Sequence, residues 1–258
     1  MSALLELIVL LIFIFIWFRP VLKRKKEAGG YVDRKTEVIA LIFGLIPATL
    51  VLLLCQFALG WVFNRTGISD HRMLVGALKA FVMFGAIEEL TKYAFARLAL
   101  KKYETLKKID IMVIFGLVGM GYEITESMML GNVFAGIARG IFVAHIMYQF
   151  IMGHFFYESI RAKNQGNDAV ARRNRIFCLA IPMLIHGFND YVIDLISVIM
   201  GETENAGVSG LASYAEMTNS QNIGIIVCVL VMILLNLFCL IWGLKLAKKD
   251  PEVEVTLK

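Results

Sequence analysis

The chain contains seven apolar stretches that are each long enough to cross a lipid bilayer. They cover approximately residues 3–20, 37–63, 73–100, 110–132, 138–160, 176–200 and 222–246. A helix of about 20 apolar residues spans the hydrocarbon core of a bilayer. Apolar residues make up 59% of the chain and charged residues 18%, which excludes a soluble domain and a disordered chain. The sequence therefore predicts an all-α fold, a polytopic transmembrane bundle of about seven helices.

Basic residues lie between these stretches in a one-sided pattern. Twenty of the 26 Lys and Arg residues fall in segments 19–36, 101–109, 161–175 and 245–258. Cytoplasmic loops of membrane proteins carry such an excess of Lys and Arg. We therefore predict that the N-terminus lies outside and the C-terminus inside, with the first helix kept as an uncleaved anchor. The net charge of +5 then reflects topology and contact with anionic lipid, so we expect no nucleic-acid partner.

Ionisable side chains are grouped inside four of the apolar stretches. They are Glu88, Glu89 and Lys92, then Glu123 and Glu126, then His145, and finally His186 and Asp190. Each charged residue costs about 3 kcal/mol to insert at the centre of a membrane helix, and such residues usually mark functional sites. Helical spacing places the lysine between the two adjacent glutamates. We expect all of these groups to converge on one hydrated pocket. Polar contacts between packed helices are the alternative, but Ser, Thr, Asn or Gln usually serve that purpose.

This set of side chains contains the groups that hydrolysis requires. A carboxylate beside a cation and a second carboxylate provides one base and one acid. Histidine adds a proton carrier or an electrophile for an oxyanion. The chain has neither a GxSxG nor an HExxH motif. The pattern therefore favours hydrolysis by water that a carboxylate activates.

Four motifs resemble those of the PrsW family of intramembrane proteases. They are EELTK at 88–92, YEITE at 122–126, the isolated His145 and HGFND at 186–190. The family belongs to a wider group with the CAAX-processing and bacteriocin-immunity-type proteins, and the resemblance covers about residues 73–200. It implies an intramembrane endopeptidase of the bacterial plasma membrane. The substrate would be a membrane-embedded or membrane-anchored protein, such as an anti-sigma factor cut near the outer face.

The resemblance also implies roles for individual residues. Glu88 or Glu89 would activate the water, and Lys92 would tune the pair. The site would be completed, and the oxyanion stabilised, by Glu126, His145, His186 and Asp190. Two positions depart from the family pattern: Ser127 stands where an Asn is usual, and Glu123 where a small or apolar residue is usual.

Zinc is the alternative to a metal-free site. Catalytic zinc takes three protein ligands of the His and carboxylate type, which His145, His186 and Glu126 or Asp190 could supply. No closely spaced ligand pair presets that geometry. We therefore expect a glutamic-type site without a cofactor, and keep the metalloprotease as the second interpretation.

The chain is thus expected to comprise three regions. Residues 1–36 form an anchor helix and a basic cytoplasmic loop, residues 37–200 the catalytic bundle, and residues 201–258 an outer loop and a C-terminal helix. Two further functions stay open: a non-catalytic membrane binding or immunity protein, and a proton-coupled transporter. Binding or protection that survives loss of the site residues would favour the first. Flux that depends on Glu126 and needs no peptide would favour the second.

Overall fold

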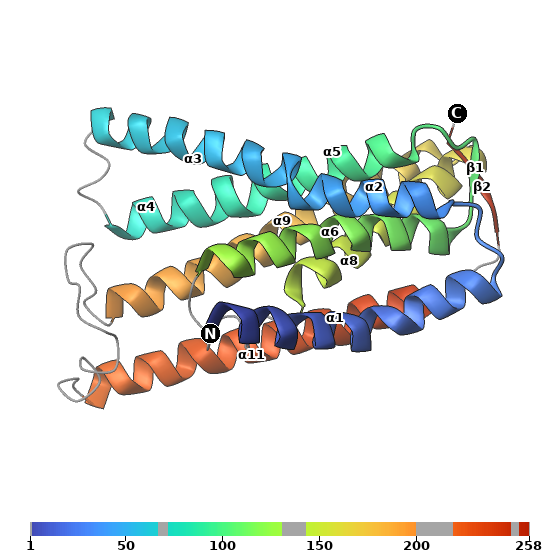
Figure 1. Cartoon of the computed structure of the whole chain (residues 1–258). Helices are drawn as coiled ribbons and strands as arrows, with labels where there is room; N and C mark the ends of the chain where they lie inside the picture. Colours follow the sequence, from blue (N-terminus) through green and yellow to red (C-terminus); the bar gives the residue numbers. More distant parts are fainter. Residues whose placement is uncertain (1, 67–71, 131–142, 200–218, 249–252, 258) are drawn as a thin grey trace.

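The computed structural model describes residues 2–66, 72–130, 143–199, 219–248 and 253–257. In these ranges the chain is almost entirely helical, and long helices lie along one another in a bundle (Figure 1). The helices are α1 (Ser2–Glu27), α2 (Arg34–Leu45), α3 (Pro47–Thr66), α4 (Arg72–Leu78), η2 (Lys79–Glu88), α5 (Glu89–Leu100), α6 (Lys108–Leu130), α8 (Ala144–Asn164), α9 (Asp168–Ile199) and α11 (Asn219–Lys248).

Every predicted apolar stretch coincides with helical structure in these ranges. The first residues of stretch 138–160 lie outside the described residues, and the rest of it forms α8. Helix α9 begins at Asp168, earlier than the predicted residue 176. Its first two turns are polar and basic, so hydropathy alone could not detect them. The predicted all-α class is therefore confirmed, whereas the count of seven and the orientation stay predictions.

The stretch predicted as one helix over 37–63 is divided into α2 and α3. The division falls at Ile46, which has φ −112° and ψ −65°, and α3 starts at Pro47. Proline has no backbone N–H and disfavours helical geometry in the residue before it, but it fits the first position of a helix. Pro47 therefore ends one helix and begins the next.

The stretch predicted over 73–100 runs through α4, η2 and α5 without a gap, but its middle is not α-helical. Residues Lys79–Glu88 form a π-helix. A π-helix bonds each residue to the fifth along the chain, is rare, and often lies at a functional site. The α-helical spacing used for Glu88, Glu89 and Lys92 therefore applies from Glu89 onwards, and Glu88 is the last residue of the π-helix.

Helices α6 and α8 lie at the centre of the bundle. Helix α6 packs against α1, α2, α5 and α8, and α8 packs against α9 and α11. The residues of α8 from His145 to Gly153 are buried on every side of the helix. A helix that is buried on every side lies in the interior of a protein, and this part of α8 forms the centre of the bundle.

Glycines bring the helices around this centre into close contact. A Cβ added at Gly85 of η2 would lie 2.5 Å from the carbonyl oxygen of Met183, and one at Gly121 of α6 would lie 2.3 Å from that of Leu41. Small residues allow membrane helices to approach closely. These contacts hold η2 close to α9 and α6 close to α2.

Two helices among the described residues are long and apolar enough to cross a membrane by length and composition. They extend over Asp168–Ile196 in α9 and Gln221–Ala247 in α11. Both have large apolar side chains on their exposed faces, for example Leu184 and Leu234, as expected where a helix contacts lipid.

A short sheet that the sequence did not predict joins the loop between α5 and α6 to the C-terminal segment, at one end of the bundle. Strand β1 (Thr105–Leu106) pairs antiparallel with β2 (Val255–Thr256). Tyr157 of α8 donates a hydrogen bond to the Val253 oxygen at 2.9 Å. The segment after α11 is thereby held against the loop before α6. The division into three regions stays a prediction.

Candidate active site

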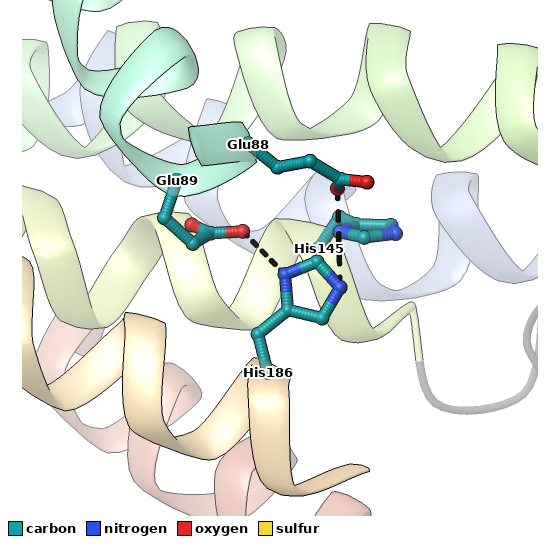
Figure 2. Close-up of side chains that lie close together, drawn as sticks. All are labelled: Glu88, Glu89, His145 and His186. Carbon is teal, nitrogen blue, oxygen red and sulfur yellow. Dashed lines mark hydrogen bonds and ion pairs between the residues drawn. The ribbon is translucent and has the colours of Figure 1, made fainter. Parts of the chain in front are cut away.

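Five ionisable side chains meet in the interior of the bundle. They come from η2 and α5 (Glu88, Glu89 and Lys92), from the start of α8 (His145) and from the middle of α9 (His186). None is more than 3% exposed. Figure 2 shows both glutamates and both histidines turned toward one another. The predicted convergence of these groups is present in the structure.

Lys92 holds the two glutamates together. Its Nζ lies 2.7 Å from Oε1 of Glu89 and 3.3 Å from Oε2 of Glu88. The spacing of three and four residues across the junction of η2 and α5 places all three on one side, as the sequence predicts. The same Nζ lies 4.0 Å from the centroid of the Tyr122 ring, a cation–π contact that adds to the stabilisation of the buried charge.

His145 connects this group to α6. Its Nδ1 lies 2.8 Å from Lys92 Nζ, and its Nε2 lies 2.5 Å from Oε2 of Glu126. An ammonium group can only donate, so Nδ1 accepts the hydrogen bond from Lys92 and Nε2–H donates to Glu126. The carboxylate of Glu126 therefore fixes both the orientation and the tautomer of the His145 ring.

Glu123 fixes the backbone at the same position. Helix α8 follows Val143, which has a left-handed conformation with φ 42° and provides no side-chain cap. The His145 N–H instead donates to Oε2 of Glu123 at 2.9 Å. The first N–H groups of a helix need external acceptors. The extra acid that distinguishes the second motif is thus a cap supplied to α8 by a neighbouring helix.

His186 contacts three carboxylates. Its Nδ1 donates to Oε1 of Glu89 at 2.9 Å, and its Nε2 lies 3.4 Å from Oδ2 of Asp190 and 3.9 Å from Oε2 of Glu88. The close crossing of η2 and α9 at Gly85 and Gly187 brings this histidine to the glutamate pair.

One residue of the cluster was missed by the sequence analysis. Gln149, one turn after His145 on α8, donates from Nε2 to Oε2 of Glu89 at 2.7 Å and is fully buried. Its spacing of four residues from His145 was the available signal. An amide in an apolar helix is common enough as a packing contact that the spacing alone did not distinguish it.

The seven predicted site residues therefore form one connected network. Glu126 and Asp190 lie at its edge, with side chains 19% and 11% exposed, whereas those of Glu88, Glu89 and Lys92 are at most 1% exposed. The network places the residues together, and their roles in catalysis stay predictions.

The same cluster fits a metal ion in the kind of donors it offers. Glu88, Glu89, His145 and His186 each provide one ligand atom, and the four atoms lie within 4.8 Å of one another. Each histidine also faces a carboxylate outside this set, as metal-bound histidines commonly do. Glu126, which the sequence analysis included as an alternative ligand, lies outside the four. The Lys92 ammonium is within hydrogen-bond distance of three of them.

A helical membrane bundle with a buried network of carboxylates and imidazoles defines a candidate intramembrane hydrolase. The sequence model of the family described as PrsW family intramembrane metalloprotease matches residues 34–235, which include all seven predicted site residues. The chain belongs to this family, and the predicted resemblance is confirmed. Membership supports an intramembrane peptidase activity. No curated protein and no solved structure matches the chain.

Proposed function

We propose that the protein is an endopeptidase that hydrolyses a peptide bond of a membrane-embedded or membrane-anchored protein, with Glu88 as the general base. The observation that carries this proposal is the unequal environment of the two adjacent glutamates. Glu89 is bonded through both oxygens, to Lys92 and His186 at one and to Gln149 at the other. The ion pairs of Glu88 are longer, at 3.3 Å to Lys92 and 3.9 Å to His186.

This difference assigns a separate task to each carboxylate. An oxygen that already accepts two charged or short hydrogen bonds is poorly available to a water molecule. Glu88 is therefore the carboxylate that accepts a proton from the attacking water. Glu89 holds Lys92 and His186 in place. After the attack, Glu88 returns the proton to the amine that leaves.

Positive charge and N–H donors beside Glu88 serve the second half of the reaction. Attack by water places negative charge on the carbonyl oxygen of the peptide bond. Donors already fixed in a buried site stabilise such charge strongly. In the network, Lys92 supplies positive charge here and His186 supplies the N–H of Nε2, which Asp190 orients. His145, held by Glu123 and Glu126, positions Lys92.

Metal-dependent hydrolysis is the second mechanism that the donor set supports. Glu88, Glu89, His145 and His186 would hold the ion, and bound zinc supplies a Lewis acid and a more acidic water. We favour the metal-free reaction because Lys92 already brings a cation to three of these donors. We expect purified protein to contain no stoichiometric zinc and to stay active in a chelator. One zinc per chain, lost together with activity, would establish the metalloprotease instead.

The decisive experiment compares Glu88→Gln with Glu89→Gln. Membranes from cells producing each variant or the wild type are analysed by mass spectrometry for new protein termini. We expect Glu88→Gln to lose roughly 100-fold to 10,000-fold in cleavage, the range for a lost general base. Glu89→Gln, which weakens a positioning contact, should lose less and keep the wild-type pH profile.

Glu158→Gln is the matched control, since this glutamate pairs with Arg161 near the other end of α8. It should cleave like the wild type. Full cleavage by Glu88→Gln would end the proposal of a Glu88 base. Full cleavage by both cluster variants would end the proposed peptidase mechanism altogether.

A further inference from the structure

A cleft of about 580 Å³ lies between α1 and α2, near the loop that joins them. Both helices pack on α6, and Leu117 of α6 lines the cleft between them. Figure 1 shows α1 and α2 on opposite sides of α6. The volume falls within the range of about 300–1,000 Å³ that is usual for small-molecule sites. We propose that this cleft binds the phosphate-bearing headgroup of an anionic phospholipid.

The charges that line the cleft favour an anion. Lys25, Lys26 and Arg34 line it together with one acid, Glu37. Lys25 is neutralised within the protein, since its Nζ lies 2.5 Å from Oε1 of Glu37 and donates to the Val32 oxygen. Lys26 and Arg34 form no hydrogen bond or ion pair with any side chain in the described ranges. Two uncompensated cations therefore face the same space.

Apolar residues continue from these cations toward the middle of the bundle. On α1, Leu22 lies one turn before Lys26. On α2, Val38 lies one turn after Arg34, and Leu41 follows it. Because the chain reverses direction between α1 and α2, both helices place the cation near the connecting loop and the apolar residues further in.

This order matches a phospholipid and distinguishes it from a free phosphate. A phospholipid places its charge at the level of the headgroups and its acyl chains deeper in the bilayer. Basic pockets between membrane helices bind anionic headgroups in this way. Leu22 and Val38 are 42% and 50% exposed, so an acyl chain can cover them. A free phosphate would use the cations alone and would gain nothing from the apolar wall.

The glycines beside the cleft keep its opening free of side chains. Gly29 has φ +60°, which L side chains rarely adopt, and a Cβ at Gly30 would lie 2.5 Å from Oδ1 of Asp110. Asp110 in turn accepts hydrogen bonds from the backbone N–H groups of Tyr31 and Val32. The loop after α1 is thereby fixed, and the opening keeps its shape without a ligand.

The test measures lipid binding to the full-length protein and is independent of peptidase activity. Purified protein in detergent is titrated with phosphatidylglycerol or phosphatidylcholine, and bound lipid is counted by native mass spectrometry. We expect phosphatidylglycerol to bind in preference. Lys26→Gln/Arg34→Gln should weaken the binding of phosphatidylglycerol roughly 25-fold, since each basic side chain contributes about fivefold to the binding of anionic lipid.

Two further variants distinguish lipid binding at this cleft from non-specific attraction of anionic lipid to the positively charged protein. Lys23→Gln/Lys163→Gln removes the same charge from exposed residues outside the cleft and should bind phosphatidylglycerol like the wild type. Lys26→Arg/Arg34→Lys keeps the charge and should keep the affinity. Circular dichroism of each variant verifies that the helices are intact.

Three outcomes would overturn the proposal. The first is equal binding of phosphatidylglycerol and phosphatidylcholine by the wild type. The second is equal weakening by the two charge-removing double variants. The third is displacement of phosphatidylglycerol by inorganic phosphate at a similar concentration, which would show an anion site without a lipid preference.

Discussion

Gln149 determines how the two glutamates of the site differ. Its side-chain amide donates to the second oxygen of Glu89, so that both oxygens of this carboxylate accept short hydrogen bonds. The hydrogen bond of Gln149 goes to Glu89 and not to the proposed base Glu88. It is therefore a positioning residue, and its effect should be found in the rate of the reaction more than in substrate binding.

Gln149→Met tests this role with a side chain of similar length that lacks the amide. A hydrogen bond to a charged group is worth about 1.5–3 kcal/mol, so we expect kcat to fall roughly tenfold to hundredfold with little change in KM. Gln221→Met is the control. It removes a side-chain hydrogen bond to the Ile199 oxygen, away from the cluster. A tenfold to hundredfold rise in KM for Gln149→Met, with kcat unchanged, would contradict the positioning role of Gln149.

At the scale of single residues, much of the network could be predicted because membrane burial is so costly to ionisable groups. Acids, a lysine and histidines inside apolar helices have few explanations other than a shared site. Glu123 and Gln149 gained their roles only from the structure. Glu123 binds a backbone N–H on another helix, and no spacing along α6 could indicate which N–H needed an acceptor.

The crossing of η2 and α9 is the element-level contact on which the site depends most directly. A Cβ at Gly187 would lie 2.7 Å from the Phe81 ring and 3.0 Å from the Ala80 oxygen. Any side chain there pushes α9 away from η2 and moves His186, its neighbour in sequence, away from the glutamates. The glycine pair therefore sets the distance between His186 and the glutamates in the candidate site.

Gly187→Ala should therefore reduce both stability and cleavage. Overpacking of a tight contact costs about 1–3 kcal/mol, which a thermal unfolding experiment detects as a lower Tm. Gly60→Ala is the control, since a Cβ there has open space around it, and it should leave Tm unchanged or raise it. An unchanged Tm for Gly187→Ala would show that the crossing can relax.

Asp33 links the start of α2 to the loop before β1. Its carboxylate accepts hydrogen bonds from the Thr36 N–H at 2.8 Å, Lys102 Nζ at 2.6 Å and the Tyr103 hydroxyl at 2.8 Å. These hydrogen bonds hold the pKa of Asp33 well below its usual range. The bond from Lys102 has the largest effect, and those from the Thr36 amide and Tyr103 have smaller ones. A lowered pKa stabilises the folded state above the usual value of about 4, and this stabilisation is lost as pH falls further.

Acid should therefore loosen the beginning of α2. We expect hydrogen exchange at the Thr36 amide to accelerate, relative to its intrinsic rate, as pH falls below about 4. Asp33→Asn should remove this pH dependence, and Asp168→Asn, in the first turn of α9, should retain it. The same acceleration in Asp33→Asn would contradict the assignment to Asp33.

Among the elements, the sequence indicated the helices but not their interruptions. Apolar content locates a helix without revealing its hydrogen-bond register, so the π-helical turns of η2 left no trace in hydropathy. The break at Pro47 had a recognisable cause. It was missed because the apolar stretch continues on both sides of it.

At the scale of the whole molecule, charge and hydropathy predicted a helical membrane protein, and family membership supports this. The pairing of β1 with β2 could not be predicted, since two-residue strands have no periodic pattern. Both strands lie at the end of the bundle where the basic loops gather (Figure 1). This is also the end at which the proposed lipid cleft opens.

The groups of the candidate site come from separate parts of the chain. Glu88 and Lys92 precede α6, His145 begins α8, and His186 and Asp190 follow the turn at Gly166, which has open space around it. A chain divided at that turn would leave the glutamates in one fragment and His186 in the other. Neither fragment alone would contain the complete candidate site. Two co-produced fragments would recover function only if they associated in the bilayer.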